Sequence, residues 1–504
     1  MRRRLAWLAA WAMAAAASSA CADPTVRVES GVVAGVEKGP AAVFKAIPFA
    51  AAPVGPLRWR PPRPAARWKG VRPAAQAGPA CPQPILPGGA PNGGGYNGPT
   101  SEDCLTLDVT APTGAGGAPV MVWIYGGGNV FGATNLPSYD AVNFARDGVV
   151  VVAMNYRLGP LGFFAHPALT REAGRARPLA NYGLMDQIAA LRWVKRNIAA
   201  FGGDPNNVTI FGESAGGGDV LALLAVPSAR GLFHKAIVQS GGGWSKPTSL
   251  ATREAEGAAL AQRLGLPGAK ATAAQLRALP PEKLTAMGPS GVTVDGRLLP
   301  EGVTSAIARG RVADVPLIIG SNSNEASLIA LFGGRVENVL KEVTPELRAV
   351  YAAEAPSDAE LARVAFNDGF MGAPARWVAA QTAGGAPAWL YYFSYVPERQ
   401  RATRPGTNHA SEIPFVFDSI DAIPGRTALA SPSERAATAL THSCWVGFAK
   451  TGKPLCAGGQ DWPAYNPQTD QLLEIGIESG VRQHFRKSQL DAQEKASPDL
   501  PPSR

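Results

Sequence analysis

One short segment limits the fold of this 504-residue chain more than any other. Apolar residues at 208–211 lead into Gly212-Glu213-Ser214-Ala215-Gly216, and apolar residues at 222–226 then continue in a helical pattern. A chain that leaves a strand and enters a helix within so few residues must reverse sharply, and the flanking glycines leave room for the crowded backbone. We therefore expect Ser214 to project from the carboxyl end of a sheet.

The same turn predicts chemistry. The amide of Ala215 would lie at a helix N-terminus, where partial positive charge favours an anion. Ser214 is therefore a candidate nucleophile, and the Ala215 N–H is a candidate donor to an oxyanion. The alternative interpretation is a glycine-rich turn that contains a bystander serine.

Other apolar runs are typical of strands that are buried on both faces, as in parallel sheets. Residues 184–198 place apolar side chains at spacings of three and four, which indicates a helix with one buried face. Strands that alternate with helices predict an α/β fold with a large, mainly parallel central sheet flanked by helices. The runs are 119–125, 149–153, 235–238, 316–319 and 389–395.

The chain reads as one large domain. At about 150 residues per domain its length would allow about three, but the α/β pattern continues throughout, and 46% hydrophobic residues provide for a large core. We expect a single domain over 23–487. Residues 255–290 and 340–382 are expected to form helical excursions over the active site, and the polar tail 488–504 is expected to be disordered.

Three glycines follow the run 119–125. Attack by a serine on an ester carbonyl places negative charge on the carbonyl oxygen, and preorganised N–H donors lower that barrier. Glycines allow the substrate to approach the backbone closely, so the amides of Gly126, Gly127 and Gly128 are candidate oxyanion donors. The alternative is a flexible turn between strand and loop.

A nucleophilic serine in this kind of fold needs an acid and then a histidine further along the chain. Three histidines satisfy that order. His409 lies in a loop beyond the run 389–395, where it could reach the serine. His442 lies in a helical apolar pattern that indicates packing, and His484 lies in an alternating pattern that indicates a strand.

Glu325 is the candidate acid. It follows the run 316–319 through Gly320-Ser321-Asn322-Ser323-Asn324, and thus lies at another strand end. A carboxylate there could orient the imidazole and stabilise its cation. Asp295 and Glu301 are alternatives, although their surroundings are typical of turns.

The N-terminus predicts export. Three arginines at 2–4, an apolar run over 5–17 and small residues at 18–22 have the pattern of a signal peptide that is cleaved after Ala22. Lipidation of Cys21 and a twin-arginine address are alternative interpretations. No later run of 18 apolar residues suggests an integral membrane segment, so we expect a periplasmic or secreted protein.

Charge and cysteines narrow the function further. The net charge of +9 is scattered, without the basic stripe and interleaved aromatics expected for nucleic-acid binding; it leaves attraction of anionic substrates open. The four cysteines after residue 22 predict two local disulfides in an oxidising compartment. The close Cys or His pairs of a metal site are absent from the sequence. The predicted pairs are Cys81–Cys104 and Cys444–Cys456.

Several long strings resemble one family: the type-B carboxylesterases of the α/β-hydrolase superfamily, which are related to cholinesterases and bacterial para-nitrobenzyl esterases. The resemblance extends from about Val26 to Tyr465. It rests on residues 44–50, 102–109, 155–159, 181–187 and 211–217.

The resemblance assigns roles to matching positions. It implies Ser214 as nucleophile, Glu325 as acid and His409 as base, with Gly127, Gly128 and Ala215 as oxyanion donors. Glu213 and Ser240 would lie close behind these groups, and Cys81–Cys104 resembles the family's first disulfide loop. No cofactor is implied, and the substrate would be a small ester; the sequence does not indicate the oligomeric state.

Two positions depart from the family. Asn129 stands where many members carry an aromatic residue on the acyl side of the pocket. The loop 81–104 contains no Trp, and Tyr96 is its only aromatic residue, so choline binding through a cation–π contact is not expected.

The hypothesis is an exported ester hydrolase that forms an acyl-enzyme. The alternatives are a non-catalytic binding homologue, which the complete triad disfavours, and an esterase specialised for polyanionic or polyester substrates. Amide and lactone cleavage would use the same groups.

Overall fold

The computed structural model describes residues 23–285, 288, 290–331, 333–423, 430–498 and 500. The expected signal peptide 1–22 and the lipidation candidate Cys21 lie outside these residues.

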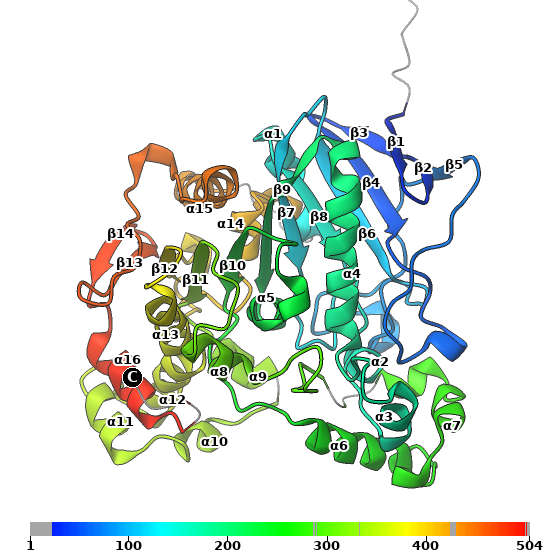
Figure 1. The fold of residues 1–504 in the computed structure, drawn as a ribbon. Coiled ribbons are helices and arrows are strands. Elements are labelled where there is room, and N and C mark those ends of the chain that lie inside the picture. The colour runs from blue at the N-terminus through cyan, green and yellow to red at the C-terminus, as the bar shows by residue number, and fades with distance from the viewer. Residues whose placement is uncertain are drawn as a thin grey trace, which may run out of the picture.

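An eleven-stranded mixed sheet forms the centre of the molecule (Figure 1). Seven neighbouring strands of this sheet run parallel, in the order β8-β7-β9-β10-β11-β12-β13. These strands are β7 (Ala118–Ile124), β8 (Val150–Met154), β9 (Gly203–Glu213), β10 (Lys235–Gln239), β11 (Leu317–Asn322), β12 (Ala388–Phe393) and β13 (Gln471–Ile475).

Antiparallel strands complete both edges of the sheet. They are β14 (Gly480–Gln483) at one edge, and β6 (Thr106–Pro112), β4 (Ala41–Pro48) and β3 (Val36–Lys38) at the other. A separate three-stranded sheet contains β1 (Thr25–Val28), β2 (Gly31–Ala34) and β5 (Val71–Pro73).

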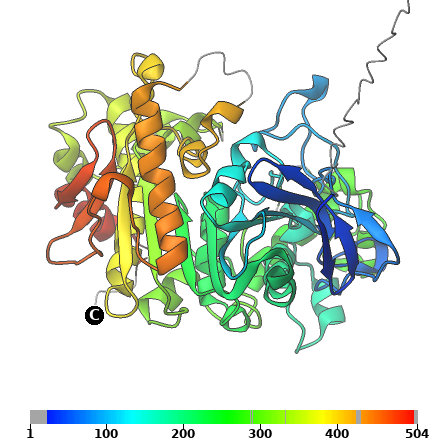
Figure 2. The same cartoon turned by 90° about the horizontal axis from the view of Figure 1, so that it is seen from above.

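Helices lie on both faces of the large sheet (Figures 1 and 2). Strands β8 and β10 are buried along their whole length, because helices cover both of their faces. This burial explains the continuous apolar runs and confirms the predicted α/β architecture. The longest helices are α4 (Tyr182–Asn197), α6 (Leu250–Arg263) and α15 (Pro432–Thr451).

The helical excursions form as expected, although each consists of several separate helices. Figure 1 shows them along the edge of the sheet where β9 and β11 end. The first excursion contains α6 and α7 (Ala273–Arg277). The second contains α10 (Val336–Leu340), α11 (Pro345–Tyr351), α12 (Asp358–Asn367) and α13 (Ala373–Thr382).

The prediction of a disordered tail from residue 488 is wrong for its first part. Residues Lys487–Ala496 form helix α16. Leu490 is buried, and the Gln493 amide donates to the Tyr351 hydroxyl at 3.0 Å and to the Ala365 carbonyl at 3.1 Å. The polar composition was misleading because these polar side chains find specific partners on neighbouring helices.

Candidate active site

Ser214 lies at the sharp turn between β9 and helix α5 (Ala215–Ala225). Its backbone has φ 55° and ψ −124°, a conformation that non-glycine residues rarely adopt and that costs about 1–3 kcal/mol. A Cβ added at Gly216 would lie 2.1 Å from the Ile124 carbonyl oxygen. Because strand β7 passes so close, only glycine fits there, and the turn leaves Ser214 partly exposed.

The glycine loop, residues 125–129 after β7, packs directly against this turn. A Cβ on Gly126 would approach Ser214 Cβ to 2.9 Å. Gly127 and Gly128 have φ values of 101° and 65°, which favour glycine. Among the described residues, neither of these two amides donates a hydrogen bond within the protein. The Ala215 amide belongs to the first turn of α5, where N–H groups lack intrahelical acceptors.

Glu325 follows β11 and is fully buried. Its Oε2 atom lies 2.5 Å from His409 Nδ1. Its Oε1 atom accepts hydrogen bonds from the backbone amide of Asn322 at 2.7 Å and from the Ser240 hydroxyl at 2.6 Å. The carboxylate is thereby held in one orientation on the imidazole.

The loops that carry the acid and the base are joined by their backbones. The Asn324 amide donates to the Thr407 carbonyl at 2.8 Å, as part of an isolated parallel bridge between Asn324 and Asn408. The His409 amide donates to Ser327 Oγ at 3.0 Å. Two loops far apart in the sequence therefore form one unit beyond the ends of β11 and β12.

The other ring nitrogen of His409 faces the serine turn. Nε2 lies 3.0 Å from Glu213 Oε1, without hydrogen-bond geometry. Burial favours neutral His409, but the carboxylates of Glu213 and Glu325 outweigh burial and raise its pKa. Burial raises the pKa of Glu213 to about 8, against the opposing effect of His409.

All these groups come from the ends of neighbouring strands. The spatial order β7-β9-β10-β11-β12 brings the glycine loop, Ser214, Ser240, Glu325 and His409 to one edge of the sheet. Since these strands are parallel, their carboxyl ends meet at that edge. The loops predicted separately from the sequence thus lie together.

The alternative acid and base candidates lie elsewhere. His442, on α15, contacts the Val416 carbonyl at 2.7 Å and Asp147 Oδ2 at 3.0 Å. His484 lies just beyond β14, with a left-handed φ of 52°, and not within a strand as predicted. Asp295 accepts backbone amides in a turn, and Glu301 pairs with arginines.

Sequence reasoning did not identify a further buried carboxyl, Glu412. It accepts hydrogen bonds from Gln239 Nε2 at 2.9 Å and Asn322 Nδ2 at 2.5 Å. Its position three residues after His409, directly before an apolar run, was the available signal. Asn367 of α12 was also missed; its Oδ1 accepts the Glu325 amide at 2.7 Å.

Asn129 does not present its side chain as the resemblance implied. The residue is 4% exposed, and its Nδ2 donates to Asp219 Oδ1 at 3.2 Å, in the interior. The departure from the aromatic residue of the family therefore changes the support of the glycine loop.

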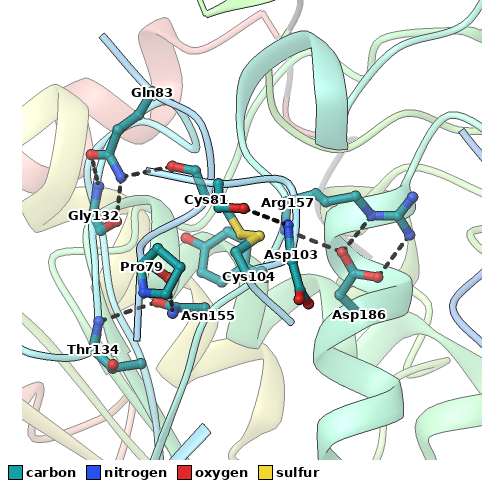
Figure 3. The surroundings of a disulfide bond; sticks show 12 residues. Pro79, Cys81, Gln83, Asp103, Cys104, Gly132, Thr134, Asn155, Arg157 and Asp186 are labelled. Carbon is teal, nitrogen blue, oxygen red and sulfur yellow. Dashed lines mark hydrogen bonds and ion pairs between the residues drawn. A yellow bond between two sulfur atoms is a disulfide. The ribbon is translucent and has the colours of Figure 1, made fainter. Parts of the chain in front are cut away.

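Both predicted disulfides are formed, Cys81–Cys104 and Cys444–Cys456. Figure 3 shows that Gln83, two residues after Cys81, reaches the backbone of Gly132. Gln83 accepts the Gly132 amide at 2.9 Å and donates to the Gly132 carbonyl at 2.7 Å. This first disulfide therefore braces the segment next to the candidate oxyanion donors. Within the described ranges, no group of three His, Cys, Asp or Glu residues could hold a metal ion.

Known proteins resemble this chain over most of its length. The sequence model of the Carboxylesterase family matches residues 22–493. The chain belongs to the carboxylesterase family. It accordingly has the α/β-hydrolase fold and is an enzyme of the type-B carboxylic ester hydrolase class.

Two characterised relatives illustrate the similarity. The chain is 35% identical to the fumonisin B1 esterase of Sphingopyxis macrogoltabida, over 91% of this chain and 88% of that protein. It is 36% identical to the para-nitrobenzyl esterase of Bacillus subtilis (strain 168), over 92% and 97% of the two chains. A solved structure of a PNB esterase superposes with a TM-score of 0.78 at 33% identity, covering 92% of this chain and 99% of that one.

The location of this carboxylesterase is indicated by its disulfides. Disulfides persist in oxidising compartments, so the two found here suggest an extracellular or periplasmic protein. In the part of the chain that the structure describes, no helix has the length and apolar character needed to cross a bilayer.

Proposed function

We propose that this carboxylesterase is an exported serine hydrolase in which Ser214, His409 and Glu325 act as nucleophile, base and acid. The observation that carries the proposal is the placement of His409. One ring nitrogen contacts the buried Glu325 carboxylate at 2.5 Å, and the other faces Glu213, the residue before Ser214.

In the proposed reaction, His409 Nε2 accepts the Ser214 proton while Oγ attacks the ester carbonyl carbon. The amides of Gly127, Gly128 and Ala215 receive the resulting oxyanion. The tetrahedral intermediate collapses, His409 returns the proton to the leaving alcohol, and an acyl-serine remains. A water molecule then attacks the acyl-serine in the same way, which releases the carboxylic acid and restores Ser214.

The carboxyls around His409 have different roles in this proposal. The Glu325 carboxylate accepts hydrogen bonds from the Ser240 hydroxyl and the Asn322 backbone amide, and it stabilises the imidazolium that forms during attack. Glu213 lies on the other side of the imidazole, with Oε1 3.0 Å from His409 Nε2, and burial raises its pKa to about 8.

The test is the hydrolysis of short-chain p-nitrophenyl esters by the purified protein and by Ser214→Ala. We expect Ser214→Ala to lose at least about 10³-fold in kcat, and mass spectrometry to detect an acyl adduct on Ser214 of the unaltered protein. His409→Gln and Glu325→Gln should also lose activity. Equal turnover by wild type and Ser214→Ala would refute the proposal.

An esterase specialised for polyanionic or polyester substrates remains the second candidate, and the net charge of +9 favours it. Electrostatic attraction weakens with ionic strength. Rates on a carboxylate-bearing ester should then fall as salt increases, while rates on a neutral ester of the same length should not. Identical salt profiles would remove this candidate.

Export is proposed from residues 1–22 and from the two disulfides. N-terminal sequencing of protein recovered from the periplasm or medium should begin at Asp23. A lipid-modified Cys21 in the membrane fraction would support the alternative processing, and an intact Met1 in the cytoplasm would refute export.

A further inference from the structure

Beneath the glycine loop lies a buried carboxyl that the proposed mechanism does not use. Asp219, on α5, is 1% exposed. Within the described structure its side chain accepts hydrogen bonds from Asn129 Nδ2 at 3.2 Å and Gln187 Nε2 at 2.6 Å, and forms no ion pair. Burial raises the pKa of Asp219 to about 7. A buried carboxyl held by two neutral amides is costly, which calls for an explanation.

The position of Asp219 in its helix supplies one half of that explanation. It follows Ala215 by four residues, so both lie on the same face of α5. Ala215 provides one of the three proposed oxyanion donors. Asp219 is therefore rigidly related to that donor through one helical turn.

Asn129 supplies the other half. It directly follows Gly128, and its left-handed φ of 58° is one that Asn tolerates better than most residues. Its carbonyl accepts the Gly159 amide at 2.6 Å, and its Oδ1 lies 3.2 Å from the Tyr156 hydroxyl. Tyr156 also donates to the Tyr125 carbonyl at 2.7 Å, at the start of the glycine loop.

We propose that Asp219 is a positioning residue for the oxyanion hole, acting through its hydrogen bond to Asn129. This bond joins the glycine loop to helix α5, and these are the two backbone segments that contribute the proposed oxyanion donors. The inference rests on the proposed function, because it assigns a role within that same site.

The physical reason is the precision that the oxyanion site requires. Backbone donors stabilise a developing charge only when they already point at it, and catalytic groups must be held to within about 0.5 Å. The glycines at 126–128 give the loop little stiffness of its own. A fixed acceptor on α5 sets the distance between Gly128 and Ala215 without contacting the substrate.

The network allows a conservative replacement to be distinguished from a disruptive one. Gln187 Oε1 has no hydrogen-bond partner in the described structure. In Asp219→Asn, the new carbonyl can still accept from Asn129, and its NH₂ can donate to Gln187 once that amide turns over. Asp219→Leu has a similar shape and cannot accept a hydrogen bond.

The experiment compares four variants in the full-length mature protein: Asp219→Leu, Asp219→Asn, Asn129→Gly and the double variant Asp219→Leu/Asn129→Gly. Glycine at 129 accepts the left-handed backbone and removes only the amide. Loss of one oxyanion donor costs about 10²–10³ in kcat, so misplacement should cost somewhat less. We expect kcat on p-nitrophenyl butyrate to fall about 10- to 100-fold in Asp219→Leu and in Asn129→Gly, with KM within about twofold.

Three further outcomes are expected. The double variant should be no worse than the poorer single variant, because both changes remove the same bond. Asp219→Asn should stay within about threefold of wild type. An alkyl trifluoromethyl ketone, which gives an oxyanion when it adds to Ser214, should lose affinity by the factor by which kcat/KM falls.

A control separates positioning from general loss of stability. Asp470→Asn replaces another buried carboxylate, which binds Arg376 and Tyr465 and lies directly before β13, at the amino end of that strand. It should lower Tm and leave kcat unchanged. Three results would each overturn the proposal. They are an unchanged kcat in Asp219→Leu, a loss of kcat in the double variant equal to the product of the two single losses, and an equal loss of kcat in Asp219→Asn and Asp219→Leu. If Asp219→Leu does not fold, Asn129→Gly decides alone.

Failure of this proposal can be told from failure of the proposed function. If wild type hydrolyses the ester and Ser214→Ala does not, the function holds whatever the Asp219 variants do. If wild type and Ser214→Ala are equally active, the function itself is refuted.

Discussion

Replacing Ser240 with alanine tests how Glu325, the acid of the proposed triad, is held in place. The Ser240 hydroxyl donates to Glu325 Oε1 at 2.6 Å in a fully buried setting, and no other partner of that hydroxyl lies in the described structure. Ser240 has a left-handed φ of 46°, which costs alanine and serine similar amounts. The substitution therefore removes the hydrogen bond with little added backbone strain.

The size of the effect follows from the partners that Glu325 keeps. A hydrogen bond to a charged group contributes about 1.5–3 kcal/mol, and each 1.4 kcal/mol or so is a factor of ten in rate. Full loss would thus reduce kcat roughly 10- to 100-fold. The Asn322 amide still binds the same oxygen at 2.7 Å, so we expect the lower end, about tenfold.

The assay is steady-state hydrolysis of a p-nitrophenyl ester. KM should change less than about twofold, because Ser240 acts on Glu325 and does not touch the substrate. In a Glu325→Gln background the same substitution should cost less than about threefold, since the charge it stabilises is gone. Ser419→Ala is the matched control: it removes a partly buried hydrogen bond of 2.8 Å to the Ser138 carbonyl and should leave kcat unchanged.

Two results would refute this reasoning. One is an equal loss of kcat from Ser240→Ala with and without the Glu325 carboxylate. The other is a change confined to KM.

Three further predictions concern stability. The hydrogen bond from His442 and the adjacent Arg146 outweigh burial and hold the pKa of Asp147 well below its usual value; Asp147 therefore stabilises the fold above about pH 4. The Tm deficit of Asp147→Asn should shrink as the pH falls below that value, and a constant deficit would contradict it. Replacing both Cys81 and Cys104 with alanine should lower the free energy of unfolding by about 3 kcal/mol and should also lower kcat, because Gln83 holds Gly132. Replacing both Cys444 and Cys456 with alanine should lower only Tm. Equal losses of kcat in the two variants would exclude the bracing role of the first disulfide. A chain that ends at Arg486 should unfold at lower temperature because α16 is packed; an unchanged Tm would favour a loose tail.

Most of the fold was predictable because its strands are buried on both faces. A run such as 149–153 contains no polar residue, which is typical of a strand that is buried on both faces. Parallel strands of this kind require helices that cover both faces of the sheet. The sharp turn at Ser214 was predictable for a different reason. Gly212 and Gly216 are required by close backbone contacts, so the local sequence carries the local geometry.

The errors and omissions arose where polar side chains satisfy one another over long sequence distances. Gln493 bonds to Tyr351, 142 positions earlier in the chain, and nothing near residue 493 indicates it. The pair Asn129 and Asp219 is separated by 90 positions. From the sequence alone a polar residue is predicted to be exposed, because the hydrogen-bond partner that would allow its burial is determined only by the tertiary fold.

The backbone bridge between Asn324 and Asn408 has a consequence for how such an enzyme can diversify. More than eighty residues separate the two ends of that bridge, and they contain helices α9 (Ser327–Leu331) through α13 and then strand β12 of the central sheet. Because the bridge joins the loops of the proposed acid and base directly, helices α10 and α11 between them can lengthen, shorten or be recombined without pulling the two groups apart. New substrate preferences can thus evolve on a chemical centre that stays mechanically undisturbed.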